Sequence, residues 1–239
     1  MTLFKWSSIS NAKTAVLMAR QCREREQSHP ALAQGSPEAA TATDEHWAFA
    51  SSSIVSSVMF MEANINEVFL SASMALSDET RPNFVGDGFP YVGGLLSRDD
   101  RGKLEDTWDL VEGAGLLDKY QFVLALLGKE RMDKGNAPYQ PANALVGVRN
   151  KLIHFKEGPH EVGSELRTFE RNLRSFLGGT HFQPHPFTSA GNPLFPDQLF
   201  GYAGCRWAWR TADAFAQEFH KRLGIEAAYQ PFRSTLTLA

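Results

Sequence analysis

Cysteine is scarce in this chain, since the 239 residues include only Cys22 and Cys205. Small secreted proteins built on disulfides are far richer in cysteine, so a disulfide scaffold is excluded and reduced thiols are expected. Long apolar runs are also missing: no stretch of about 18 apolar residues is available to span a membrane. Polar residues at positions 7, 8, 10 and 11 interrupt the N-terminal segment, which lacks a signal-peptide pattern. We therefore expect a cytoplasmic protein.

Neither sign of charge dominates the composition. The 24 basic and 27 acidic residues give a net charge of −3 with histidine neutral. A protein that coats nucleic acid without specificity carries a broad basic surface, so this class is excluded, whereas a small local basic site is compatible with the composition. The 43% of hydrophobic residues and the chain length suit one globular domain with extensions, or two small domains.

Several catalytic signatures are absent as well. The glycine pairs Gly86/Gly88 and Gly93/Gly94 lack the lysine and spacing of a P-loop, and no G-x-S-x-G sequence marks a serine hydrolase. His181 and His185 are spaced like a helical metal-binding pair. However, Pro184 between them prevents helix, and no cysteine or carboxylate lies near them in sequence. The sequence therefore predicts no metal and no cofactor.

Apolar residues recur at helical spacings of three and four in several segments. The longest such stripe consists of Ile54, Val58, Met61, Ile65, Val68 and Ala72. Thr43 or Asp44 is predicted to cap this helix, and Arg81-Pro82 to follow its end. Further helices are expected at about 12–27, 101–112, 116–128, 142–156, 162–177 and 203–223, with an irregular covering loop at 178–201. The sequence thus predicts an all-α fold.

The segment from Val148 to Lys156 carries the strongest indication of chemistry. Its apolar stripe is formed by Leu145, Val148, Leu152 and Phe155. At about 100° per residue, Arg149, Asn150 and His154 fall on a different face of the same helix. A fixed cation, an amide and an imidazole on one face suit phosphate chemistry better than packing.

This segment also carries a family resemblance. Arg149-Asn150-x-x-x-His154, followed by an aromatic residue and a base, resembles the signature of HEPN domains. These are small α-helical bundles, many of them metal-independent endoribonucleases of toxin–antitoxin and antiviral systems, whereas others have lost catalysis. Residues 60–67 resemble the polar-studded first helix of such bundles, and residues 204–208 are similar to the closing helix of uncharacterised bacterial members.

The resemblance covers residues 44–225 and implies an antiparallel HEPN-like bundle of four to six helices with irregular loops. We accordingly expect three parts: an N-terminal extension at 1–43, partly helical and then a flexible linker; the helical domain at 44–225; and a C-terminal tail at 226–239.

RNA cleavage by the 2′-OH needs a base, an acid and a cationic group for the charge that grows on the phosphate. His154 can transfer protons because the ordinary pKa of histidine lies near neutrality. Arg149 offers a permanently charged fork of donors that fits phosphate oxygens. Asn150 lies four residues before His154 and can orient the imidazole or the phosphate. These three residues are the predicted catalytic set.

Four further residues are predicted to support this site. Lys151 and Lys156 add positive charge along the motif segment. Glu62 and Asn66 share a face of the long helix, and Glu62 in particular could hold Arg149 or His154 in place. For these carboxylate and amide groups, solvation on the helix surface or a buried salt bridge is the alternative interpretation.

RNA cleavage needs both an acid and a base, and the motif contains only one histidine. In the proteins that the motif resembles, two protomers pair so that two copies face each other, and Gly147, Asn150 and His154 lie along one line of the helix. We therefore expect a homodimer that cleaves single-stranded RNA without metal, with an antitoxin or nucleotidyltransferase as a possible partner. The alternative is a non-catalytic dimeric scaffold that binds RNA, a nucleotide or a protein.

Overall fold

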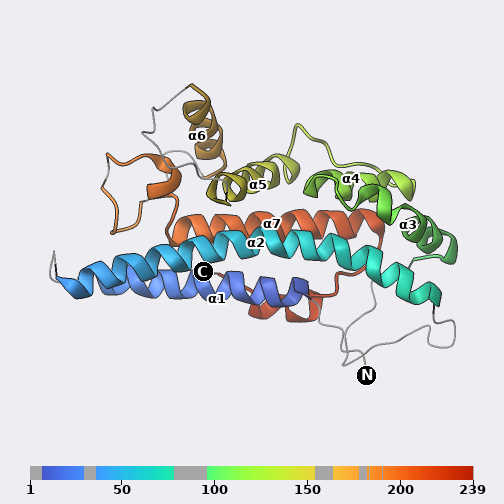
Figure 1. The fold of residues 1–239 in the computed structure, drawn as a ribbon, viewed down its shortest axis with the longest axis horizontal. Helices are drawn as coiled ribbons and strands as arrows, with labels where there is room; N and C mark the ends of the chain where they lie inside the picture. The colour runs from blue at the N-terminus through green and yellow to red at the C-terminus, as the bar shows by residue number, and fades with distance from the viewer. Residues whose placement is uncertain are drawn as a thin grey trace. The chain divides into compact units, whose positions relative to one another are not determined.

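The computed structural model describes residues 7–29, 36–77, 96–153, 164–177, 182, 184–189 and 191–238. Every regular element in these ranges is a helix, and none of these residues lies in a strand, which confirms the predicted all-α fold. The helices in order are α1 (Ser7–Ser28), α2 (Pro37–Ser77), α3 (Arg98–Val111), α4 (Leu116–Leu126), α5 (Tyr139–Ile153), α6 (Ser164–Phe176), the π-helical turn η5 (Leu194–Gln198), α7 (Tyr202–Leu223) and the 3₁₀-helix η6 (Gln230–Thr235) (Figure 1). Among the described helices, none combines the length and apolarity needed to cross a membrane.

The start of α2 differs from the prediction. The helix begins at Pro37 rather than after a cap at Thr43 or Asp44. Ser36 is the cap, because its Oγ accepts a hydrogen bond of 3.1 Å from the backbone N–H of Ala39, and proline is favoured at the first helical position. The hydroxyl of Thr43 donates instead to the Ala39 carbonyl one turn earlier, as it does inside a helix.

The chain divides into two compact units, each assembled from separate stretches of sequence. Unit 1 contains Met1–Asn11, Met59–Gln140 and Ala212–Thr237, and unit 2 contains Ala12–Val58, Pro141–Thr211 and Leu238–Ala239. The helices α1, α2 and α7 each contribute residues to both units. The predicted division into parts at 1–43, 44–225 and 226–239 stays a prediction.

The core of unit 1 is organised around Tyr120 of α4. Its ring contacts Phe215 and Phe219 of α7 edge to face, with centroids 4.8 and 4.6 Å apart. Its hydroxyl donates a hydrogen bond of 2.6 Å to the Met61 carbonyl of α2. Burial raises the pKa of Tyr120 well above its ordinary value, so the hydroxyl remains a donor. One side chain thus joins three helices through contacts that each contribute about 1 kcal/mol.

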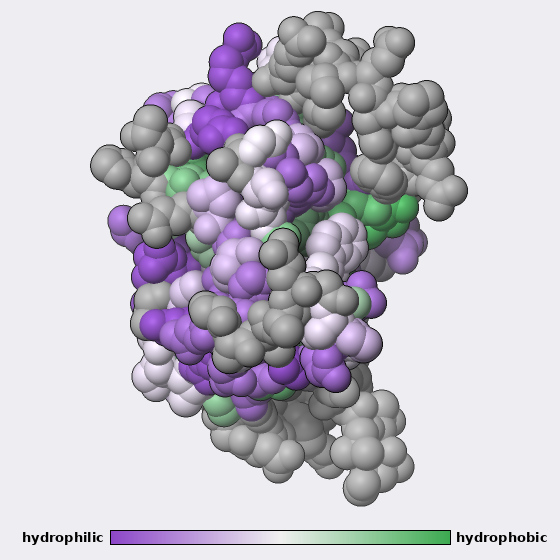
Figure 2. All heavy atoms as spheres, turned by 90° about the vertical axis from the view of Figure 1, so that its left-hand side faces the viewer, coloured by the Kyte–Doolittle hydropathy of each residue, from purple (hydrophilic) through white to green (hydrophobic). Residues whose placement is uncertain are grey.

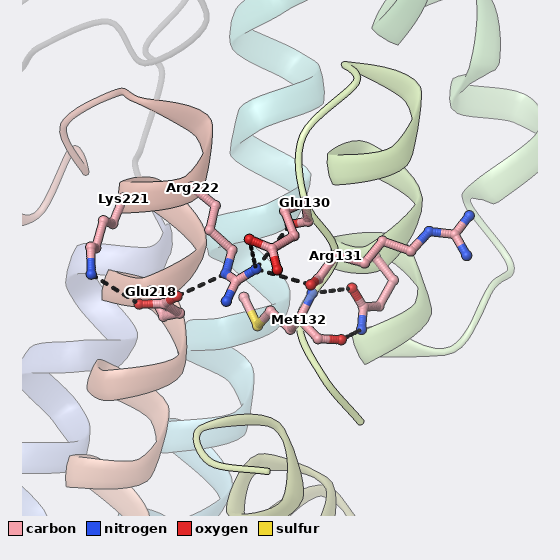
Figure 3. A network of polar contacts seen from close by, with 7 residues as sticks. Glu130, Arg131, Met132, Glu218, Lys221 and Arg222 are labelled. Atoms are coloured by element: carbon pink, nitrogen blue, oxygen red, sulfur yellow. Dashed lines mark hydrogen bonds and ion pairs between the residues drawn. The ribbon is translucent and has the colours of Figure 1, made fainter. Parts of the chain in front are cut away.

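The loop after α4 is fixed to α7 by Arg222 (Figure 3). Its guanidinium donates to the backbone carbonyls of Glu130 and Arg131 at 3.2 and 2.9 Å. The Glu218 carboxylate, one turn earlier on α7, accepts a bond of 2.7 Å from Arg222 and holds the fork in place. On the other side of the loop, the amide of Gln121 closes a pair of hydrogen bonds with the backbone of Met132. These backbone groups of the loop thus have hydrogen-bond partners, although the segment is not helical.

Small side chains bring the helices of unit 2 close together. The buried face of α1 consists of Ala12, Ala15, Val16, Ala19 and Cys22. The Ser53 hydroxyl of α2 donates a bond of 2.8 Å to the Ala15 carbonyl, a contact that requires the two backbones to approach closely. On the face drawn in Figure 2, hydrophilic residues predominate among the coloured ones, and hydrophobic residues form only small separate areas. The apolar side chains of these helices therefore serve mainly the interior.

His220 of α7 is a buried polar residue in unit 1, with 3% of its surface exposed. Its Nε2 donates a hydrogen bond of 2.9 Å to the Oδ1 of Asn64 on α2, which fixes the neutral tautomer. Burial lowers the pKa of His220 from 6.5 to about 4, because the surroundings solvate the imidazolium poorly.

The stability of the protein should fall as the pH drops from 6.5 to about 4, because the unfolded chain then binds a proton at His220 that the folded chain does not. The full effect is roughly 3 kcal/mol, at about 1.4 kcal/mol per tenfold change in proton affinity. Nuclear magnetic resonance titration of the His220 ring gives its pKa directly, and chemical unfolding of wild type and His220→Gln at pH 7 and 5 gives the stability difference. A His220 pKa of 6 or above would contradict this account.

Candidate functional site

The predicted catalytic segment lies at the end of α5 in unit 2. Leu145 and Val148 are fully buried, which confirms the first half of the predicted apolar stripe. On the other face, Asn150 and Lys151 are exposed and Arg149 is half-buried. The helix ends at Ile153, and both His154 and Lys156 lie outside the described residues. The structure thus places Arg149 and Asn150, the cation and the amide of the motif, near the C-terminal end of α5.

The side of α5 that carries Gly147 is covered by α6. A Cβ atom on Gly147 would lie 3.4 Å from Cε2 of Phe169. The Nζ of Lys151 lies 5.0 Å from the centroid of the same ring, in a cation–π contact. Phe169 in turn packs edge to face on Phe195 at 5.7 Å. At Gly147 the surface of α5 is therefore approached closely by an aromatic ring of the same chain.

Two of the four residues predicted to support the motif lie in unit 1, where Glu62 and Asn66 line a cavity of about 630 Å³. Its apolar wall comprises Met59, Ala63, Phe69, Leu70 and Trp108, and its acidic residues are Glu62, Glu67, Glu105 and Asp109. Because Arg149 belongs to the other unit, the support of Arg149 by Glu62 stays a prediction. A wall with four carboxyl groups repels phosphate, so this cavity does not favour nucleotide binding.

Asn66 and Glu67 have local roles within unit 1. The Oδ1 of Asn66 accepts a bond of 3.4 Å from Lys119, whose ammonium also lies over the Trp108 ring. The carboxylate of Glu67 accepts hydrogen bonds from the backbone N–H and the hydroxyl of Ser8, in the first turn of α1. Burial raises the pKa of Glu67, although the bonds from Ser8 oppose that shift.

A second group of reactive side chains comes together in unit 2 around the carboxylate of Glu26. One oxygen of Glu26 accepts a hydrogen bond of 2.6 Å from the backbone N–H of Tyr202, the first residue of α7. The same oxygen lies 3.0 Å from Nε2 of His46 on α2 and 3.7 Å from the thiol of Cys22 on α1. The Cys205 thiol of α7 is also buried in unit 2, where it donates a hydrogen bond of 3.8 Å to the Ala50 carbonyl of α2.

His185 completes the surroundings of this cluster. Its ring centroid lies 4.5 Å from that of His46, and its Nε2 donates a bond of 2.7 Å to the Asp197 carbonyl. Nδ1 of His185 is buried and has no hydrogen-bond partner among the described residues. A Cβ on Gly201 would lie 2.8 Å from Glu26 Oε1 and 2.5 Å from the His185 ring, so only glycine fits between these groups.

The sequence analysis missed this cluster because its members are far apart in the chain. Only Cys22 and Glu26 share a helical i,i+4 spacing, which by itself is common. His185 was set aside for want of a cysteine or carboxylate nearby in sequence, and the fold supplies both from other helices. The prediction of no metal at His185 rested on Pro184 and on its neighbours in sequence, and residues from other helices did not enter it.

Replacing Gly147 by alanine should leave the fold intact. The new Cβ meets Phe169 at the edge of van der Waals contact, and alanine is favoured over glycine in a helix by about 1 kcal/mol. We expect a stability within about 1 kcal/mol of wild type, on the stabilising side, measured by chemical unfolding. A clear loss of stability would mean that α6 packs on α5 more tightly than the structure shows.

Comparison of the whole chain with protein-family models, characterised proteins and solved structures gave no match. The functional assignment therefore depends on the chemistry of the residues described above.

Proposed function

We propose that the end of α5 is an RNA-cleaving site and that the protein is a metal-independent, HEPN-like endoribonuclease. The observation that carries this proposal is the placement of Arg149, Asn150 and Lys151 on the last turns of α5, with Asn150 and Lys151 open to solvent. No acidic residue occurs in α5, so its cations are not neutralised from within the helix. The Phe169 ring holds the Lys151 ammonium at the same place.

The proposed reaction is the attack of a ribose 2′-oxygen on the adjacent phosphorus. A base takes the 2′-OH proton, the bond from phosphorus to the 5′-oxygen breaks, and an acid protonates the leaving oxygen. His154 supplies proton transfer, Arg149 stabilises the charge on the phosphate oxygens, and Asn150 orients the imidazole or the phosphate. The products are a 2′,3′-cyclic phosphate and a 5′-hydroxyl end.

Two copies of His154, one from each protomer of a homodimer, would provide both the acid and the base. Gly147 is covered by Phe169, so the part of the predicted pairing face that is open is the side with Asn150 and Ile153. Ile153 is a large apolar side chain with 57% of its surface exposed, which favours a contact at this end of α5.

A second candidate is the non-catalytic scaffold. The observation that favours it is the Phe169 ring over Gly147, because it fills space that a phosphate would need on that side of the motif. In that case Arg149 and Asn150 serve binding or structure, and the assembly does no chemistry.

Cleavage should be abolished by His154→Ala and reduced by a factor of about 10²–10³ by Arg149→Ala, as for the loss of one preorganised charge-stabilising group. The matched control is Arg131→Ala, which removes an exposed arginine of unit 1 whose side chain points away from its neighbours in Figure 3. Labelled single-stranded RNA of mixed sequence is incubated without added Mg²⁺, and the ends are identified by phosphatase and kinase treatment. Folded wild type that cuts no RNA would favour the scaffold, and cleavage surviving His154→Ala would place the active site elsewhere.

The dimer can be tested independently of the chemistry. Ile153→Asp should shift the protein toward monomer in sedimentation experiments, because it puts a charge in the proposed contact. Leu110→Asp is the matched control, since Leu110 is an even more exposed leucine, at 80%, in unit 1. A wild type that is monomeric at tens of micromolar, or equal effects of both substitutions, would count against pairing through α5.

A further inference from the structure

Three potential ligand atoms of the Glu26 cluster lie at the separations found around one small cation. The thiol of Cys22, a carboxylate oxygen of Glu26 and a ring nitrogen of His46 all lie within 4.8 Å of one another. Bonds of about 2.0–2.3 Å to a tetrahedral zinc ion put its ligands roughly 3.3–3.8 Å apart. The 3.7 Å between Cys22 and Glu26 agrees with this spacing, and the 3.0 Å between Glu26 and His46 needs only a small adjustment.

We propose that Cys22, Glu26 and His46 form a zinc-binding site in unit 2. A thiolate, an imidazole and a carboxylate form a borderline-soft set that suits Zn²⁺, whereas Mg²⁺ and Ca²⁺ prefer oxygen alone.

The groups around these ligands are arranged as they are in metal sites. The backbone N–H of Tyr202 holds the Glu26 carboxylate, and the His185 ring lies against that of His46. His185 is itself anchored by the Asp197 carbonyl. The ligands are largely buried: Cys22 has no exposed surface, and the side chains of His46 and Glu26 have 1% and 18% exposed.

Zinc binds the thiolate form of cysteine, so binding replaces the proton of the Cys22 thiol and zinc affinity should rise with pH. The site is distinct from the end of α5, because none of its three ligands lies on that helix.

Cobalt binding to the full chain tests this site. The reduced, metal-free protein is titrated with Co²⁺, which gives a thiolate-to-cobalt charge-transfer band and the visible spectrum of tetrahedral coordination. The chain has only two cysteines, and Cys22 is the one that belongs to the ligand group, so loss of the band in Cys22→Ser would assign it to this site. We expect one Co²⁺ per chain, displaced by one Zn²⁺, and protection of the Cys22 thiol from alkylation.

Two substitutions and a matched control locate the ligands. Cys22→Ser and Glu26→Gln should each weaken zinc binding at least tenfold, whereas Glu24→Gln, an exposed position of the same helix, should leave it unchanged. If Cys22→Ser does not fold, the wild-type cobalt spectrum still decides. A folded, reduced wild type without the thiolate band, unchanged zinc affinity in Cys22→Ser, or a Cys22–Cys205 disulfide that resists reduction in the native protein would overturn the site. None of these results depends on RNA cleavage.

Discussion

In each unit, the side chain of a glutamate on one helix accepts a hydrogen bond at the start of another helix, and the packing of the unit depends on this interaction. The Glu26 carboxylate accepts a hydrogen bond from the backbone N–H of Tyr202 at the start of α7. The Glu67 carboxylate accepts hydrogen bonds from the backbone N–H and the hydroxyl of Ser8 at the start of α1. Removing a carboxylate from water costs several kcal/mol. Charge-assisted hydrogen bonds from N–H groups that the helix leaves unpaired, together with the positive end of the helix dipole, offset that cost. In unit 2, one side chain therefore connects α1 to the start of α7.

The consequences of this constraint differ between the units. In unit 1 the carboxyl group of Glu67 lies at the wall of an acidic cavity, where burial raises its pKa and the hydrogen bonds from Ser8 oppose that shift. In unit 2 the carboxylate of Glu26 contacts an imidazole and a thiol from two helices. Neither arrangement involves Asn150 and Lys151, the exposed polar residues near the end of α5.

Much of the fold was predictable from the sequence. The stripes of three and four spacing located α2, α5 and α7, and Gly224 ends α7 with a positive φ of 75°, as expected for a glycine that terminates a helix. The cap at Ser36 was missed because the Ser-Pro pair lies within a segment whose composition resembles a linker. The outward face of α5 was also predictable, because it depends only on helical periodicity. The Cys22–Glu26–His46 cluster was not, since tertiary packing brings its members together and the sequence shows only the common i,i+4 spacing of Cys22 and Glu26.

The central claim is that the Glu26 carboxylate organises a metal-binding site between three helices. The most direct measurement is an anomalous difference map from crystals of the full chain grown with zinc, collected at the zinc absorption edge. The account predicts one strong peak within bonding distance of Cys22 Sγ, Glu26 Oε1 and His46 Nε2. A well-ordered Glu26 bonded to His46 and Tyr202, with no anomalous peak beside it, would contradict the claim and leave the carboxylate as a helix cap alone.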